Sequence, residues 1–431
     1  MEIIIVGAGI AGLSAGIGLR RAGHKVTILE QSSLLQETGA AITITPNAFR
    51  VLQSWDFSPS QSRMVAIRTG SLLDGTSMEV LMPNYLHNIE ETYGAPLYSV
   101  HRVDLHNQLR LLATRTQGPG HPVEIQVRAK IVDYDPVQGK AVLADNRVLQ
   151  ADFIIAADGV HSSAVGHVLG ETEIRADNTG WSCMRWLVPT EELLSDPETS
   201  ALVKDSMQRY FTGALGAGAL VWYPCRNNEV QNFLYLSQAF DNSHATEDFR
   251  ASVEPGVPMS YARKDFGPAL QAVIKKAKDV RFWKLVAREP IPRWHRDRLV
   301  VIGDAAHPML TFQAQGGGQA IEDGAALGVL FDHLHDERSI EARLRLFEQV
   351  RRNRASAVQT LSNCSPPAPQ SVLVAASRYL PDGKRLENMG DVNEYLWKFD
   401  VVEECKAVRG GDARYESEVE KDPLVSPLVA S

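Results

Sequence analysis

Cysteine is scarce in this sequence, and the few cysteines present form no pattern. The 431 residues include four of them: Cys183, Cys225, Cys364 and Cys405. Their wide spacing, with no Cys-x-x-Cys pair, excludes a disulfide framework and a zinc-thiolate site and favours a reducing compartment, the cytoplasm. Only His333 and His335 among twelve histidines are near neighbours, and no metal-ligand spacing appears, so no metal site is predicted.

Long apolar runs and an excess of positive charge are also missing. No apolar stretch approaches the roughly 20 residues that span a bilayer, and the first expected strand begins at residue 2, so neither a membrane segment nor a signal peptide is predicted. The net charge of −8 comes from well-mixed charged residues, which argues against nucleic acid as a partner. With 44% hydrophobic residues in a chain of this length, a soluble protein with two lobes is expected.

The N-terminal segment EIIIVGAGIAGLSAGIGLRRAGHKVTILEQS is the most informative part of the chain. An apolar strand over residues 3–6 leads into Gly7, Gly9 and Gly12, which complete a G-x-G-x-x-G motif. A helix is expected over 13–22, followed by a second strand over 25–29. Glu30 ends that strand, 21 residues after Gly9.

Strand, glycines, helix and acidic residue in this order predict a nucleotide site of the Rossmann type. Gly7 permits the tight turn, Gly9 lets the backbone approach a pyrophosphate, and Gly12 lets the helix pack closely on the strand. Ala11 lies in the same phosphate-facing turn. Glu30 stands where a carboxylate would bind a ribose 2′-hydroxyl, which disfavours NADP here and leaves FAD or NAD.

Two further turns favour FAD over NAD. The segment DFIIAADGVHSS ends an apolar strand in Asp158-Gly159, and VVIGDAAHP ends another in Gly303-Asp304. A longer cofactor with a ribityl chain and a ring system needs such additional polar positions. After Gly303-Asp304 we expect a glycine-rich loop and then a helix over 320–327.

These segments together resemble the class A FAD-dependent monooxygenases, which have the para-hydroxybenzoate hydroxylase fold. Salicylate-hydroxylase-like enzymes, especially fungal members of secondary metabolism, are the most similar group. The resemblance covers about residues 2–360. Besides the segments above it is carried by GAAITITPNA (39–48), YGAPLYSVHRVDLHNQL (93–109), REPIPRWHRDRLVVIGDAAHP (288–308) and QGGGQAIED (315–323).

The resemblance implies roles for residues outside the N-terminal motif. Arg102 would reach the pyrophosphate, and Asp304 the ribityl and pyrophosphate segment. Gly316 and Gly317 would present backbone N–H groups to the pyrimidine edge of the flavin, and Ala41 would approach the isoalloxazine ring. Pro308 would lie near the flavin carbon that carries the peroxide, and the Asp158 turn would help to bind NAD(P)H.

The chain departs from the family pattern at two places. Ala164-Val165 occupies the neighbourhood in which relatives commonly have an arginine, which makes the nicotinamide route less secure. Thr311-Phe312 stands where relatives often have Pro-Tyr, which removes a hydroxyl beside the flavin.

His307 looks like a base but is interpreted as a packing residue that orients the flavin loop.

Between about 176 and 285 the sequence changes to short aromatic runs broken by Gly and Asn, which indicates an antiparallel sheet. An apolar substrate pocket is expected to be lined by Trp181, Trp186, Trp222, Tyr210 and Tyr223. Arg185 could hold a substrate phenolate or carboxylate, and Tyr223 could donate to the same group or relay a proton from it. Alternatively, Arg185 stacks on Trp186 or pairs with a carboxylate between the lobes.

The predicted fold class is therefore α/β, a Rossmann-like FAD-binding domain interleaved with a mostly antiparallel substrate domain, with a helical C-terminal region. The FAD-binding domain is assigned to 1–75, 95–175 and 285–365, and the substrate domain to 76–94 and 176–284. Residues 366–415 are expected to be helical and 416–431 to be a flexible tail.

The function implied by the resemblance is single-component hydroxylation of an aromatic or polyketide-like small molecule with NAD(P)H and O2, through a flavin C4a-hydroperoxide. The same chemistry could give epoxidation, Baeyer–Villiger insertion or oxidative decarboxylation of an indole or terpenoid. A flavin-binding scaffold without turnover is a further alternative. A monomer or homodimer is expected.

Overall fold

The computed structural model describes residues 1–33, 39–170, 176–214, 218–241, 251–334, 336–365, 368–381 and 384–419, with side chains up to 410. Its first sheet has the strand order β18-β19-β12-β1-β2-β8. The strands are β1 (Glu2–Val6), β2 (Lys25–Glu30), β8 (Glu124–Val127), β12 (Phe153–Ala156), β18 (His295–Arg296) and β19 (Leu299–Val301). All neighbours are parallel except β18 and β19.

The carboxyl edge of this sheet carries the residues predicted to bind the nucleotide, and we call it the nucleotide end. From β1 the chain continues to β2 on one side, whereas β12 and β19 lie on the other, so the strand order reverses at β1. Ligands of open parallel sheets bind outside the carboxyl ends of the strands at such a reversal. The four predicted positions Gly7, Glu30, Asp158 and Asp304 all lie at that edge.

A second sheet with the order β17-β13-β16-β15-β14-β5-β6 forms the other lobe. Its strands are β5 (Thr69–Asp74), β6 (Val80–Met82), β13 (Asp177–Pro189), β14 (Met207–Thr212), β15 (Gly218–Cys225), β16 (Val230–Ser237) and β17 (Arg281–Ala287). Only the β14–β5 pair is parallel. The predicted mostly antiparallel lobe, interleaved with the nucleotide lobe, is confirmed. Its exact residue boundaries remain a prediction, and β5 pairs here although it falls within 1–75.

Two small sheets complete the strands. One contains β3 (Ala41–Ile44), β7 (Tyr98–His101) and β4 (Val65–Ala66), and the other contains β9 (Ile131–Asp135), β10 (Lys140–Leu143) and β11 (Val148–Gln150). β3 lies next to β15 and β16 of the second sheet, to which Ala41 is hydrogen-bonded.

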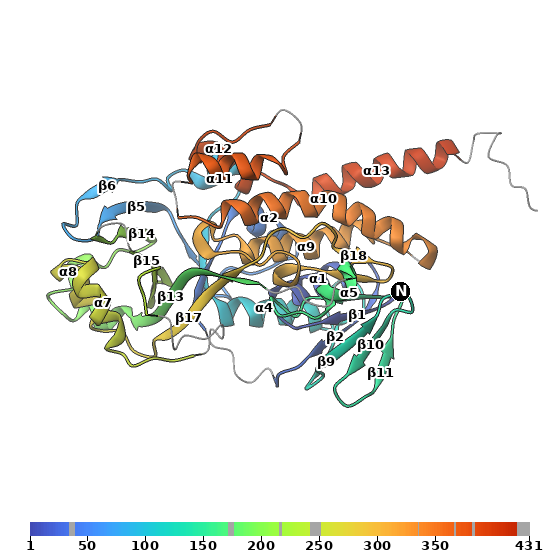
Figure 1. Ribbon diagram of the computed structural model, residues 1–431, viewed down its shortest axis with the longest axis horizontal. Coiled ribbons are helices and arrows are strands. Elements are labelled where there is room, and N and C mark those ends of the chain that lie inside the picture. The colour runs from blue at the N-terminus through green and yellow to red at the C-terminus, as the bar shows by residue number, and fades with distance from the viewer. Residues whose placement is uncertain are drawn as a thin grey trace, which may run out of the picture.

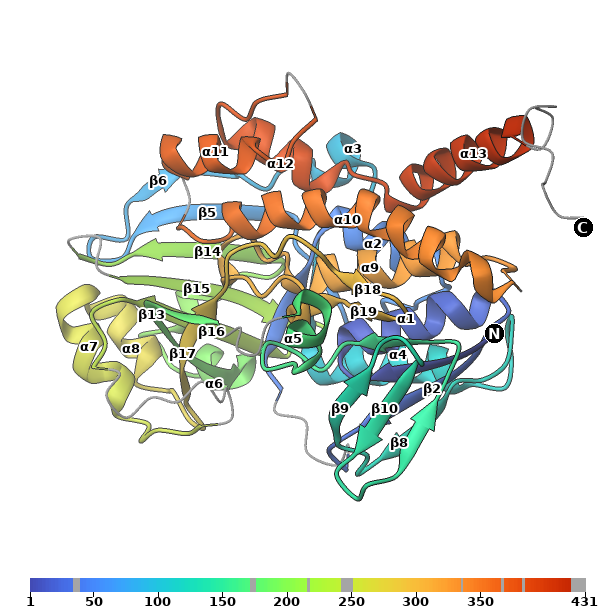
Figure 2. The ribbon, with the colours of Figure 1, turned by 45° about the vertical axis from the view of Figure 1, so that its right-hand side comes forward.

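The helices of the nucleotide lobe pack around the first sheet, and those of the second lobe cover one face of the second sheet (Figure 1). The helices up to residue 274 are α1 (Ile10–Arg21), α2 (Pro46–Ser54), α3 (Ile89–Tyr93), α4 (Arg102–Thr114), α5 (Ala164–Leu169), α6 (Thr190–Leu194), α7 (Val257–Asp265) and α8 (Pro268–Ile274). The later helices are α9 (Gly316–Leu330), α10 (Ile340–Leu361), α11 (Gln370–Ser377), α12 (Met389–Trp397) and α13 (Val401–Val419). Figure 2 shows α11 and α12 above β5 and β6.

Helix α9 begins four residues earlier than the sequence predicted. The glycines 316–318 form its first turn instead of a loop. Farther along, α9 crosses α1 so closely that a Cβ at Gly18 would lie 2.3 Å from the Gly324 carbonyl oxygen. This contact fixes α9, and with it the glycine-rich turn, against the nucleotide sheet. The predicted helical C-terminal region is present, and α13 continues to Val419, four residues into the segment 416–431 that was expected to be a tail. Residues 420–431 lie outside the described part.

Candidate functional site

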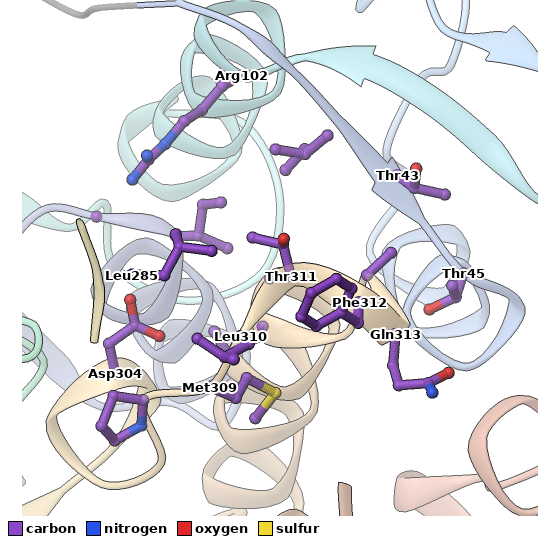
Figure 3. Close-up of a pocket in the computed structure, with 18 of the residues that line it drawn as sticks. Thr43, Thr45, Arg102, Leu285, Asp304, Met309, Leu310, Thr311, Phe312 and Gln313 are labelled. Carbon is purple, nitrogen blue, oxygen red and sulfur yellow. The ribbon is translucent and has the colours of Figure 1, made fainter. Parts of the chain in front are cut away.

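A cavity of about 940 Å³ runs from the carboxyl edge of the first sheet to the open face of the second. All of the predicted cofactor-binding residues except Gly12 line it, as do Arg185, Tyr223 and Pro308. Figure 3 shows Arg102 entering from α4, and Asp304 with residues 309–313 from the segment before α9. One continuous space therefore connects the predicted nucleotide and substrate positions.

The nucleotide end is organised around the loop after β1. The Glu30 carboxylate accepts hydrogen bonds from the Ala8 N–H at 2.9 Å and the Ser32 N–H at 2.7 Å. His106 bonds the Ala8 carbonyl at 2.6 Å. Gly12 lies outside the cavity because it supports the turn from behind, where a Cβ would lie 1.9 Å from the Gly7 carbonyl oxygen.

The cavity residues fit a dinucleotide with a flavin ring. A Cβ on Gly9 would meet no atom within 4 Å, so the space beside this backbone is open. Helices α1 and α9 both begin at the cavity and have no side-chain cap, which leaves their first N–H groups available to anionic or polar groups. Arg102 adds a cation on the same side. These groups suit pyrophosphate and the polar edge of a flavin.

Strand β3 links the nucleotide end to the second sheet through Ala41. The Ala41 N–H donates to Asn232 Oδ1 at 3.0 Å, and the Tyr223 hydroxyl donates to the Ala41 carbonyl at 2.9 Å. Burial raises the pKa of Tyr223 above its ordinary value, so its hydroxyl stays protonated. The sequence suggested Ala41 and Tyr223 separately, but nothing in it indicated Asn232.

A buried ionic cluster lies behind the segment that carries Asp304 and Pro308. It contains Glu322 and Asp323 of α9, Arg351 and Arg354 of α10, and His307. His307 bonds Asp323 Oδ2 at 2.7 Å, and the Gly303 N–H donates to the same oxygen at 2.9 Å. The interpretation of His307 as a residue that orients the flavin loop agrees with these contacts.

Charge balance within this cluster sets the ionisation of its carboxyl groups. Burial raises the pKa of Glu322, but Arg354 and Arg351 more than offset it, and the net pKa lies below the ordinary value. For Asp323, burial is likewise offset by His307 and Arg351. Both carboxylates therefore stay charged, and they contribute stability above the unfolded-state pKa that is lost when pH falls below it.

The second sheet presents its predicted aromatic residues on two different faces. Tyr210 and Tyr223 line the cavity as predicted. The prediction was wrong for Trp186 and Trp222, which are buried against α7 and α8 on the opposite face, because side chains alternate along a strand. Trp181 does not line the cavity either and packs edge-on against Phe312 with ring centroids 5.0 Å apart.

Arg185 lies on the cavity face of β13. Its guanidinium carbon lies 5.1 Å from the ring centroid of Trp283 on β17, not over Trp186. No ion pair joins it to a carboxylate within the described ranges, which excludes the second structural alternative there. Burial is the main cause that lowers its pKa.

The two departures from the family pattern differ in their position. Ala164 and Val165 are buried in the core of the nucleotide lobe and offer no side chain to the cavity. Thr311 and Phe312 do line it.

His101 gives the protein a pH dependence that can be measured. Burial, followed by the positive charge of Arg226, lowers its pKa from 6.5 to about 4. The unfolded chain therefore binds this proton first as pH falls, and stability is lost between pH 6.5 and 4. We expect His101→Gln to remove roughly 2 kcal/mol of the loss of unfolding free energy between pH 7 and 5, measured by urea denaturation. A pH dependence of the unfolding free energy in His101→Gln that equals that of the wild type would contradict this assignment.

Sequence comparison gives the class of this chain. Residues 1–362 match the family described as "FAD binding domain". The chain belongs to this family and, with a relative named an FAD-dependent monooxygenase at 65% identity, it is an FAD-dependent monooxygenase. The predicted resemblance is confirmed.

Individual relatives support the same class. FAD-dependent monooxygenase phomE' of Diaporthe leptostromiformis is 65% identical, over 88% of this chain and 96% of the relative. The 3-hydroxybenzoate 6-hydroxylase 1 of Aquipseudomonas alcaligenes is 31% identical, over 84% of this chain and 87% of the relative. Among solved structures, CtdE in complex with FAD and substrate 4 has a TM-score of 0.78 at 21% identity and covers 97% of this chain and 100% of CtdE, which shows a common fold. No described helix is both long and apolar enough to cross a membrane.

Proposed function

We propose that this enzyme uses NAD(P)H and O2 to hydroxylate an aromatic, phenol-containing small molecule. The proposal rests mainly on the position of the Arg185 side chain in the cavity. Arg185 is a cation without a carboxylate partner among the described residues, and it faces the same cavity as Ala41, Tyr223 and Pro308. A partly buried cation of this kind suits a phenolate. The hydroxylase activity in the name of one relative is consistent with such a substrate.

Arg185 would orient the substrate and lower the pKa of its phenolic hydroxyl, because an adjacent positive charge favours the ionised form. Ionisation makes the ring more electron-rich and therefore more reactive toward an electrophilic oxygen. The ring of Trp283 beneath the guanidinium restricts its position.

Before the substrate ionises, its hydroxyl would donate a hydrogen bond to the Tyr223 oxygen, while the Tyr223 hydroxyl donates to the Ala41 carbonyl. This arrangement places the substrate hydroxyl beside β3, which borders both halves of the cavity. The proton relay through Tyr223 remains a prediction.

The cofactor would be held by Gly7, Gly9, Ala11 and Glu30 at its adenosine end and by Arg102, Asp304, Gly316 and Gly317 farther along. Bound FAD supplies electron transfer from NAD(P)H to O2. The segment 308–312, with Met309, Leu310 and Phe312, provides apolar surface that excludes water from the reacting centre.

Arg185→Leu tests the proposal. Loss of a hydrogen bond to a charged group costs about 1.5–3 kcal/mol, so kcat/KM for a phenolic substrate should fall about 10- to 150-fold. FAD content should stay at the wild-type level, and Arg185→Lys should recover part of the activity because it retains the charge. Wild-type kcat/KM in Arg185→Leu would exclude Arg185 as the phenolate partner.

A further inference from the structure

The floor of the cavity in the second sheet is one continuous row of side chains. Each residue of the row is the register partner of the next, and all of them line the cavity: Arg185, Leu234, Val221, Tyr210, Leu72 and Met82. Neighbouring strands lie about 4.8 Å apart, so the step from Arg185 to Tyr210 spans roughly 14 Å across three strand spacings. The cavity is therefore long in the direction across the strands.

The two ends of this row differ in chemistry. Arg185 provides a cation at the β13 end, and Leu234 and Val221 make the middle apolar. At the far end Gln208 Nε2 donates to the Tyr85 hydroxyl at 3.2 Å, and the Tyr210 hydroxyl bonds Ser365 Oγ at 2.7 Å.

The groups at the far end are neutral and have hydrogen-bonding capacity to spare. Burial raises the pKa of both Tyr85 and Tyr210, so each keeps its proton. Within the described ranges the Gln208 amide has no partner besides Tyr85. A neutral polar group of a ligand would find both a donor and an acceptor there.

Helix α12 covers this far part of the cavity. Met389, Gly390 and Asn393 near its beginning line the cavity. Its other end is fixed by Arg354, which donates to the carbonyl groups of Tyr395 at 2.6 Å and Leu396 at 2.8 Å. Because α12 is held in this position, the space between α12 and the second sheet is an ordered part of the cavity.

The row reaches the surface at its far end. Met82 on the edge strand β6 is 52% exposed although it also lines the cavity. A ligand longer than the enclosed part could therefore extend toward solvent past β6.

We propose that the substrate is an elongated, multi-ring phenol whose reacting ring lies beside Arg185 and whose distal hydroxyl or carbonyl group is bound by Gln208 and Tyr210. This inference rests on the proposed function. The roughly 14 Å between the strands that carry Arg185 and Tyr210 exceeds the length of a single substituted benzene ring. Gln208 and Tyr210 are then specificity-determining residues, distant from the reacting atoms.

Equilibrium binding to the FAD-loaded enzyme without NAD(P)H tests the proposal, with tryptophan fluorescence as the readout. The probes are salicylate, 3-hydroxybenzoate and two flavanones, naringenin and pinocembrin, which differ only in one distal hydroxyl. We expect both flavanones to bind more tightly than the single-ring acids. Naringenin should bind about 3- to 12-fold more tightly than pinocembrin, because one additional hydrogen bond contributes about this factor to the affinity.

Variants then assign the preference to residues. Gln208→Leu and Tyr210→Phe should each reduce the naringenin preference and leave the Kd of pinocembrin unchanged. Thr212→Val, on the same face of β14 but outside the cavity lining, should keep the preference. Thermal unfolding of each variant shows whether the fold is intact.

The outcomes separate this inference from the proposed function. If the single-ring acids bind as tightly as the flavanones, if no probe binds, or if both variants keep the preference, the elongated-substrate inference is overturned. Substrate-stimulated NAD(P)H oxidation, measured with the same probes, tests the proposed function independently of the binding preference.

Discussion

Arg351→Met lowers the free energy of unfolding by about 3–5 kcal/mol in our expectation and reduces bound FAD, the largest effect predicted here. The Arg351 side chain is fully buried, with Nε bonded to Asp323 Oδ1 at 2.9 Å and Nη1 bonded to Glu322. Methionine fills similar space but leaves two buried carboxylates with too little positive charge. Because both carboxylates lie on α9, whose first turn lines the cofactor end of the cavity, FAD content should fall together with stability.

Urea denaturation and the visible absorbance of the purified protein measure both consequences. Arg345→Met on the same helix is the matched control, since the Arg345 side chain is 69% exposed and its pair with Glu341 is a surface contact. It should change stability by less than about 0.5 kcal/mol. An Arg351→Met protein as stable as the Arg345→Met protein would show that the buried cluster does not hold this region together.

Gly12→Ala weakens FAD binding by about 5- to 150-fold in our expectation, which corresponds to an overpacking cost of about 1–3 kcal/mol. The new Cβ would lie 1.9 Å from the Gly7 carbonyl oxygen. The backbone of Gly7 has little room to move away from it. Its φ is +101°, and a Cβ there would lie 2.5 Å from the Ala157 carbonyl oxygen. The loop that faces the cofactor would have to move.

Substitutions at two other glycines distinguish displacement of the loop from a reduction of the space available to the ligand. Gly9→Ala should leave the stability of the FAD-free protein unchanged, because its Cβ meets no protein atom, but it should weaken FAD binding by occupying the cavity. Gly256→Ala, at an exposed position with open space, should change neither quantity. Titration of the FAD-free proteins with FAD gives each Kd. A wild-type Kd in Gly12→Ala would contradict the assignment of this loop.

Local sequence signals predicted the cofactor end well. Gly7, Gly9 and Glu30 lie at the ends of strands that are adjacent in sequence, so short-range rules place them together. Asp158 and Asp304 were recognisable because each follows an apolar strand, and parallel strands bring their carboxyl ends to one edge. The positions of Ala41 and Pro308 came from the family resemblance.

Residues that depend on packing between distant segments could not be predicted in the same way. Glu322 and Asp323 resemble an ordinary polar pair at the start of a helix, and only the docking of α10 shows that both are buried against arginines. Trp186 and Trp222 carried a correct strand signal, but the sequence did not reveal which face of the sheet would be covered by α7 and α8. The glycines 316–318 were expected in a loop because glycine is a poor helix former, yet the contact between α9 and α1 favours the helix.

The most direct test of the proposed function is oxidation of NADPH and NADH by the FAD-loaded enzyme with phenols, salicylates and multi-ring resorcinols, with the mass of each product recorded. We expect oxidation to be stimulated by a phenolic substrate and the product to gain one oxygen atom as a ring hydroxyl. FAD-bound protein that shows no stimulated oxidation and no oxygenated product with any phenol would contradict the proposal.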